Sequence, residues 1–202
     1  MSPKRKYELK KRAEEMAETR RRITAAAIEL HGSIGPARTT MSAVAKRAGV
    51  ERRTLYRHFP NETDLFAACS SHYFAANPFP DLDGWRAIRD PRQRLERALQ
   101  ELYAYYERTE EMFRNVLRDA ELVDFARTAV APLQSYLDEA TEILMDGRGA
   151  RGRQRELLRG ALRHALAFST WRSLSENGIG RSGTVKLVAA LVEGATAPAS
   201  AN

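Results

Sequence analysis

The sequence of 202 residues predicts an all-α protein. Apolar residues recur at spacings of three and four in segment after segment, which is the helical period. Alternating runs of β-branched residues, typical of strands, are missing. Glycine-rich breaks such as "HGSIGP" (31–36) and "DGRGARG" (146–152) separate the helical stripes. Together these patterns predict about nine helices, in one large domain or two small ones.

The first helix is expected to extend toward the N-terminus as a basic arm. Its apolar stripe follows positions i, i+3, i+4 and i+7 and comprises Ile23, Ala26, Ala27 and Leu30. Leu9 and Met16 continue the same stripe backwards at seven-residue intervals. Residues 1–22 hold 9 Lys/Arg against 4 Asp/Glu. Residues 1–19 are therefore predicted to be a basic helical extension.

The segment "TTMSAVAKRAGV" (39–50) predicts a short helix and a tight turn. Thr40 suits the N-cap because its hydroxyl can accept a bond from a free amide of the first turn. The apolar face of this helix comprises Val44, Ala45 and Ala48. Gly49 suits a left-handed residue at the helix end. A third helix is expected from Glu51 to His58, and the pair is typical of a helix-turn-helix.

Further helices are expected beyond Asn61, which can cap the next one. The segment 77–85 is predicted to be a loop, and Asp90-Pro91 suits a helix start. The stripes that mark these helices lie at 65–73, 95–106, 112–120, 133–144, 157–174 and 185–192.

Positive charge is concentrated in the first third of the chain. Residues 1–60 hold 15 Lys/Arg and 6 Asp/Glu, whereas residues 61–202 hold 18 and 20. This asymmetry favours a segment that meets a polyanion, and the alternative is a solubilising tail. At the start of the third helix, Arg52 and Arg53 offer planar forks that match guanine O6 and N7. Tyr56, Arg57 and His58 can contact the DNA backbone.

The segment "TTMSAVAKRAGVERRTLYRHFPNETDLF" (39–66) resembles the DNA-binding region of tetracycline-repressor-type (TetR family) regulators. The family implies an all-helical homodimer with a three-helix DNA-binding domain and a larger helical ligand-binding and dimerisation domain. The predicted base contacts are Ser42, Arg52 and Arg53. The predicted phosphate contacts are Thr40, Thr54, Tyr56, Arg57 and His58.

Two residues depart from the family pattern. Glu51 stands where serine or threonine often caps the recognition helix, and glutamate caps poorly. Glu62 stands where lysine often approaches a phosphate. The basic extension is expected to compensate with added phosphate or minor-groove contacts.

The expected domains are the extension (1–19), the DNA-binding domain (20–66), the ligand-binding and dimerisation domain (67–195) and a disordered tail (196–202). Candidate pocket residues are Tyr103, Tyr106, Met112, Phe113, Phe125, His164, Phe168 and Trp171. The same stripes suit an ordinary core. Few acidic side chains lie on them, which favours a small hydrophobic or aromatic effector. The candidate dimer residues are Ala161, Ala165, Val188, Leu191 and Val192, and the alternative is burial within one subunit.

The sequence argues against an enzyme, since no catalytic motif, metal-ligand cluster or cofactor fingerprint is found. A single cysteine, Cys69, and the lack of a signal or membrane segment indicate a cytoplasmic protein. The leading hypothesis is a repressor that an effector releases from a palindromic operator on double-stranded DNA. The alternative is a DNA-binding protein whose helical domain docks a protein partner. An enclosed apolar pocket would favour the former, and a filled core with an exposed apolar patch the latter.

Overall fold

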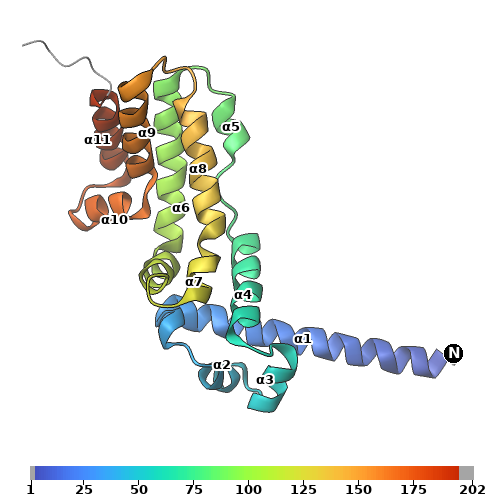
Figure 1. Ribbon diagram of the computed structural model, residues 1–202. Coiled ribbons are helices and arrows are strands. Elements are labelled where there is room, and N and C mark those ends of the chain that lie inside the picture. The colour runs from blue at the N-terminus through green and yellow to red at the C-terminus, as the bar shows by residue number, and fades with distance from the viewer. Residues whose placement is uncertain (1–2, 196–202) are drawn as a thin grey trace, which may run out of the picture. The chain divides into compact units, whose positions relative to one another are not determined.

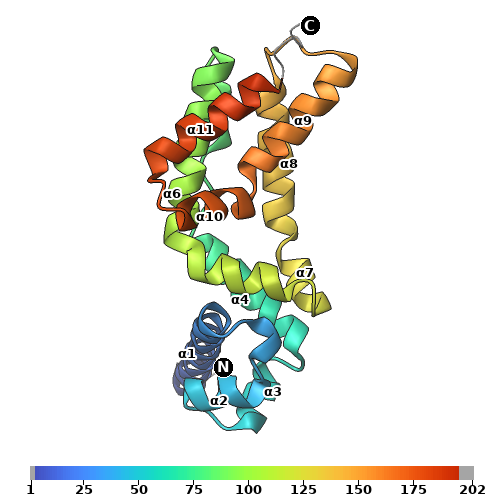
Figure 2. The same cartoon turned by 90° about the vertical axis from the view of Figure 1, so that its left-hand side faces the viewer.

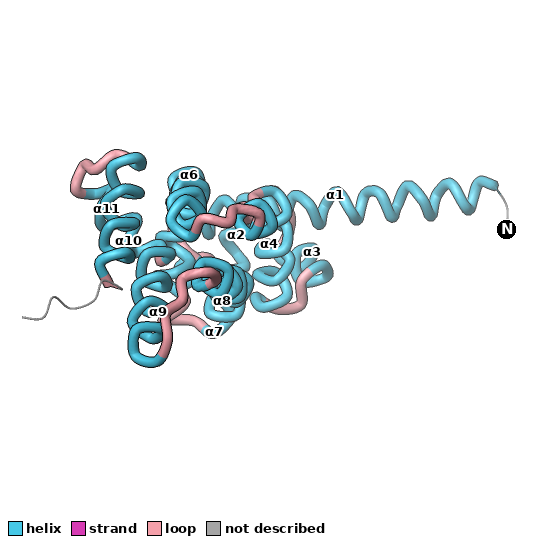
Figure 3. The backbone as a smooth tube through the Cα atoms, turned by 90° about the horizontal axis from the view of Figure 1, so that it is seen from above, coloured by secondary structure: helices cyan, strands magenta, loops and turns pink. Residues whose placement is uncertain are grey.

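The computed structural model describes the backbone of residues 3–195 and the side chains of residues 7–195 apart from Ala129. The tail predicted to be disordered (196–202) lies outside the described residues. Within them the chain forms eleven α-helices, one 3-10 helix and no strand (Figure 3). The prediction of an all-α fold is confirmed. The helices form two compact units, which differ from the boundaries drawn from the sequence: unit 1 comprises Met1–Pro78 and Glu111–Val130, and unit 2 comprises Phe79–Glu110 and Ala131–Asn202.

Unit 1 contains the expected DNA-binding helices and a second stretch from later in the chain. Its elements are α1 (Pro3–Ser33), the 3-10 turn η1 (Pro36–Arg38), α2 (Met41–Ala48), α3 (Arg52–His58), α4 (Glu62–Ala76), α7 (Asp124–Ala129) and the last turns of α6 (Pro91–Asp119), as labelled in Figure 1. Helix α1 packs against α2 and α4, and α2 packs against α3. The predicted helical extension is therefore the first part of α1.

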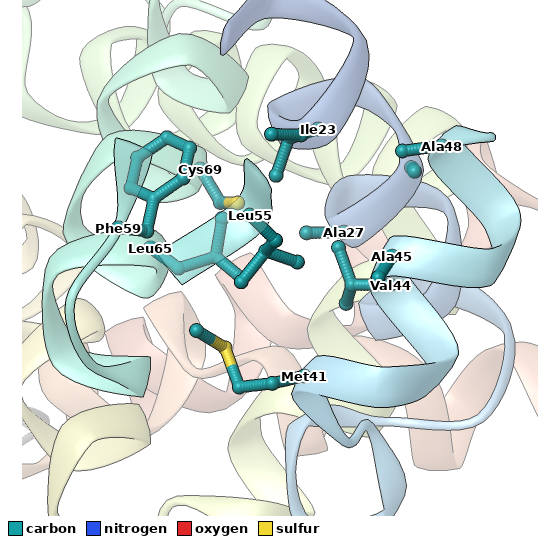
Figure 4. Close-up of a cluster of buried hydrophobic side chains, with 11 residues drawn as sticks. Ile23, Ala27, Met41, Val44, Ala45, Ala48, Leu55, Phe59, Leu65 and Cys69 are labelled. Atoms are coloured by element: carbon teal, nitrogen blue, oxygen red, sulfur yellow. The ribbon is translucent and has the colours of Figure 1, made fainter. Parts of the chain in front are cut away.

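A small apolar core holds α1 to α4 together (Figure 4). Leu55 and Phe59, predicted to face inward, are fully buried. Leu55 is the buried residue of α3, which has only seven residues. An isolated helix of this length is unstable in water, so packing must hold α3 in place. The core comprises Ile23, Ala26, Ala27, Met41, Val44, Ala45, Ala48, Leu55, Phe59, Leu65 and Cys69.

The last turns of α6 grip the loop between α1 and α2. The buried Asp119 carboxylate accepts the amide of Ala37 at 2.9 Å and Nε of Arg118 at 2.7 Å. Burial opposes ionisation, but these bonds outweigh it and hold the pKa of Asp119 below its ordinary value. Asn115 donates to the carbonyl of Gly32. Gly35 has a φ of 93°, and a Cβ there would collide with Arg118 and Asp119. We name these contacts the α6 clamp.

Unit 2 is a helical bundle around an aromatic core. Its elements are the first turns of α6, α5 (Leu82–Arg86), α8 (Ala131–Met145), α9 (Gly152–Leu166), α10 (Phe168–Glu176) and α11 (Arg181–Gly194). Figure 2 shows α9, α10 and α11 side by side, in agreement with their mutual packing. Tyr103 and Tyr106 are fully buried, and their hydroxyls donate to the carbonyls of Ala165 and Leu166 at 2.8 and 2.7 Å.

Three details of the helix prediction are wrong. The segment 77–85 contains the start of α5, which the carboxylate of Asp81 caps by accepting the amides of Asp83 and Gly84. The stripes 95–106 and 112–120 lie on one helix, α6, since no helix breaker separates them. The stripe 157–174 is broken at Ala167, which has extended backbone angles and ends α9 before α10 begins. The described chain thus has eleven α-helices instead of about nine.

Candidate nucleic-acid interface

Both ends of α2 are capped as the sequence predicts. The hydroxyl of Thr40 accepts the amide of Ala43 at 3.1 Å. Gly49 adopts left-handed angles (φ 65°, ψ 39°). The amides of Gly49 and Val50 donate to the carbonyls of Lys46 and Ala45, which is the Schellman arrangement. This turn sets the direction in which α3 leaves α2.

We expect Gly49→Ala to destabilise the protein by about 1–2 kcal/mol, the cost of a Cβ in the left-handed region. The new Cβ would also lie 3.1 Å from the guanidinium of Arg22. Urea unfolding measures the loss. Gly160→Ala is the matched control, since Gly160 lies inside α9 with open space around its Cβ position. Equal stability of the two variants would contradict a role for the left-handed turn.

Helix α3 presents its charged residues to solvent and its apolar residue to the core. Arg52, Arg53 and Arg57 are exposed, and Tyr56 is 40% exposed. The guanidinium of Arg52 lies over the Tyr56 ring, 5.8 Å from its centroid. Ser42, on α2, is exposed as well. The predicted base contacts Ser42, Arg52 and Arg53 are thus all available to a ligand of unit 1.

The other predicted phosphate contacts are either half-buried or already hydrogen-bonded. Thr54 and His58 are half-buried. The Nε2 atom of His58 is buried and has no hydrogen-bond partner among the described residues. Burial, followed by the charges of Arg57 and Arg20, lowers the pKa of His58 and so disfavours its charged form. Thr40 is exposed but already caps α2.

Two arginines of α1, which the sequence patterns did not single out, hold the helix-turn-helix. Arg22 donates to the carbonyls of Ala48 and Gly49 at 2.6 and 3.2 Å. Arg20 donates to the carbonyl of His58 at 2.8 Å and lies over the Phe59 ring, 4.1 Å from its centroid. The carbonyls at helix ends lack partners within the helix, and cations stabilise them. In the sequence, the only unusual feature of these residues is that they belong to a run of three consecutive arginines, 20–22.

The starts of α3 and α4 differ in their caps. Glu51 precedes α3 and makes no side-chain cap, as expected for glutamate. Asn61 caps α4 by accepting the amide of Asp64 at 2.8 Å, as predicted. Glu62 is exposed at the first position of α4. The negative charge of its carboxylate would repel a DNA phosphate that approached the start of α4.

The candidate pocket residues fall into both units. Tyr103, Tyr106, Phe168 and Trp171 pack on one another in unit 2, with neighbouring ring centroids 5.3–6.4 Å apart. His164 is exposed on α9. Three candidates belong to unit 1, where Phe125 packs on Phe66: Met112, Phe113 and Phe125.

The five candidate dimer residues lie together along one open groove. This groove, with a volume of about 340 Å³, is formed by α9, α10 and α11. Leu191 is 64% exposed there. The groove also includes His164. Its lining comprises Ala161, His164, Ala165, Ser169, Thr170, Ser173, Leu174, Val188, Leu191 and Val192.

Residues 23–69 match the family model described as "Bacterial regulatory proteins, tetR family". The match covers the core of unit 1 from Ile23 to Cys69. Over this stretch the chain is similar to the TetR family. A stretch of 58 residues is 38% identical to the HTH-type transcriptional regulator AcrR of Shigella flexneri. That match spans 29% of this chain and 27% of AcrR.

Solved TetR-type structures share the fold over most of this chain. A TetR-like transcriptional regulator from Rhodococcus sp. RHA1 matches with a TM-score of 0.63 and 16% identity, over 87% of this chain and 93% of that one. NalD, the secondary repressor of the MexAB-OprM multidrug efflux pump in Pseudomonas aeruginosa, matches with a TM-score of 0.58 and 18% identity, over 90% and 97%. At these identities the likeness concerns the fold.

Neither a metal centre nor a membrane span is found in the part of the chain that the structure describes. No group of three or more His, Cys, Asp or Glu side chains there could hold an ion. None of its helices combines the length and apolar character needed to cross a bilayer.

Proposed function

We propose that this protein is a transcriptional repressor of the TetR family that binds a palindromic operator as a homodimer and is released by a small hydrophobic or aromatic effector. The observation that carries the DNA-binding part is the recognition helix α3. Arg52 and Arg53 are exposed at its N-terminal end, where such helices contact base edges, and the buried Leu55 anchors the helix. Similarity to NalD, a repressor by its description, supports the negative sign of regulation.

Two copies of α3 are needed to read a palindrome, with half-sites roughly 34–36 Å apart. The groove of α9, α10 and α11 supports dimerisation, since small and branched residues line it and allow close helix packing. Leu191 would cover the groove of the second copy, which explains its exposure in a single subunit.

We expect Leu191→Glu to convert the dimer into a monomer, because it places a charge in an apolar interface. Sedimentation equilibrium of the two proteins measures the change. Leu122→Glu is the matched control, since Leu122 is 68% exposed and lies in unit 1. A Leu191→Glu protein that stays dimeric would place the interface elsewhere.

In this proposal the effector binds at the aromatic cluster of unit 2. Phe168 and Trp171 lie on α10, which starts at the break after Ala167, and both rings contact Tyr106. A planar effector could bind against Tyr106 by replacing these rings. Trp171 is one of two tryptophans, so in a Trp85→Phe protein its fluorescence reports such binding directly.

The test of the proposed function is operator binding across a salt series. DNA from upstream of the protein's own gene is compared with scrambled DNA of equal length. A specific reader prefers its site by roughly 10³-fold or more. Equal affinity for both, and for duplexes selected from a random library, would contradict the proposal. Aromatic compounds that quench Trp171 and release the operator would identify the effector class.

A partner-docking role is the second candidate. Tyr103 and Tyr106 are closely packed core residues, whereas the groove with the exposed Leu191 is open and apolar. This combination favours a surface that another chain covers. If the Leu191→Glu exchange leaves the dimer intact, that surface is free for a different protein.

A further inference from the structure

Helix α1 continues far beyond the core of unit 1. Its first buried residue is Ile23, and every described side chain from Tyr7 to Glu18 is exposed. From Pro3 to Ile23 the helix rises about 30 Å, at 1.5 Å per residue. Figure 1 shows this part of α1 running past α2 and α3 of the same unit. We name residues 4–19 the α1 extension.

The direction of the extension is fixed relative to the helix-turn-helix. Arg22 binds the carbonyls at the turn after α2, and Arg20 binds the carbonyl at the end of α3. Ile23, the residue that follows Arg22, is fully buried. Helix α1 is therefore held on two sides by the elements that carry the predicted base contacts, and its N-terminal turns cannot rotate independently of them.

The helical period places a basic residue on the side that faces the helix-turn-helix. Arg12 precedes Ile23 by eleven residues, which is close to three turns of 3.6 residues. Arg12 therefore lies on the same face of α1 as Ile23 and, like Lys10 and Lys11, is exposed. At 100° per residue, Glu14 and Glu18 point away from this face, whereas the exposed Glu8 and Glu15 lie about 60 and 80° from the direction of Ile23. The sequence adds Lys4, Arg5 and Lys6 to the first turns.

We propose that the α1 extension binds the phosphates of the DNA that flanks each half-site, outside the bases read by α3. This inference rests on the proposed function. Duplex DNA carries one negative charge per roughly 1.7 Å, so an extension about 24 Å long, with six Lys and Arg against four Glu, passes several phosphates. A helix about 10 Å wide does not enter the minor groove, which is about 6 Å wide, and the contacts therefore carry no base specificity.

The test compares two triple variants that remove equal charge. Lys10→Gln, Lys11→Gln and Arg12→Gln neutralise the extension, and glutamine preserves helix propensity. Arg151→Gln, Arg153→Gln and Arg155→Gln neutralise exposed residues of unit 2. Both full-length proteins bind an operator duplex selected from a random library by the parent chain. One duplex ends at the half-sites, and the other continues for roughly 10 base pairs on each side, which at 3.4 Å per pair is longer than the extension of about 24 Å.

The slope of log K against log salt is negative. We expect it to become shallower in the extension variant by about 0.9 for each phosphate that is no longer bound, on the long duplex only. Preference for operator over scrambled DNA should stay the same, since no base contact is removed. The unit 2 variant should keep the parent slope.

Equal slopes for parent and extension variant, or an equal decrease in the unit 2 variant, would overturn the inference. Both outcomes leave the proposed function intact as long as the operator is preferred. If the parent chain prefers no sequence, the proposed function fails. The slopes on non-specific DNA then still decide whether the extension binds phosphates.

Discussion

Replacing Arg52 and Arg53 by alanine is expected to abolish operator recognition while leaving the fold intact. Both side chains are exposed at the start of α3, so their removal costs little packing. A good bidentate contact to guanine discriminates by about 1–3 kcal/mol, which makes the pair worth a factor of roughly 30 or more in affinity. Fluorescence anisotropy with operator and scrambled duplexes measures the change. The two affinities should converge.

The single variants and a distant arginine separate base reading from general attraction. Arg151→Ala removes an exposed charge from unit 2 and should leave the operator preference unchanged. If Arg52→Ala and Arg53→Ala weaken binding to operator and scrambled DNA by the same factor, both residues contact phosphates. The assignment of base contacts would then pass to other side chains of α2 and α3.

Leu55→Ala is expected to destabilise unit 1 by about 2–5 kcal/mol, the usual cost of a buried leucine truncated to alanine. Leu55 is fully buried and lies on a helix of seven residues, so the surrounding core can close the cavity only by displacing α3. Urea unfolding followed by circular dichroism measures the destabilisation. DNA binding should fall even where the protein stays folded, because α3 positions the arginines.

Leu157→Ala provides the comparison, since Leu157 is 51% exposed on α9. Its effect should stay within about 0.5 kcal/mol, as for other surface substitutions. A Leu55→Ala protein with the same stability as Leu157→Ala would mean that α3 does not depend on its core contact. The geometry of the recognition surface would then need a different support.

The sequence was most informative where the signals are local. The cap at Thr40, the left-handed Gly49 and the inward positions of Leu55 and Phe59 all depend on neighbours a few residues away. Each has a steric or hydrogen-bonding cause that the sequence contains. The helix-turn-helix could therefore be predicted almost residue by residue.

Long-range contacts could not be predicted in this way. Arg20 and Arg22 act on carbonyls 38 and 26–27 positions away, and Asp119 binds an amide 82 positions away. No spacing rule connects such partners. The break at Ala167 was equally hidden, since alanine favours helices and its extended angles are set by the packing of α9 and α10.

Aromatic stripes gave the weakest guidance. Tyr106 and Trp171 satisfy the period of a core-facing helix whether they line a cavity or fill it. In unit 2 both are buried in contact with other rings. A structure with a bound effector would show whether these side chains line a binding site or only fill the core.

The α6 clamp limits how the helix-turn-helix segment can be transferred to another protein. The loop that leads into α2 is held by Asn115, Arg118 and Asp119, which come from far beyond the helix-turn-helix in the chain. A hybrid regulator made by joining the first 78 residues to a foreign sensor domain would inherit the DNA-reading helices without this grip. Successful hybrids should therefore also carry residues 111–130, the second stretch of unit 1. Unit 1 cannot be transferred as a single continuous segment, because it is built from two separate stretches of the sequence.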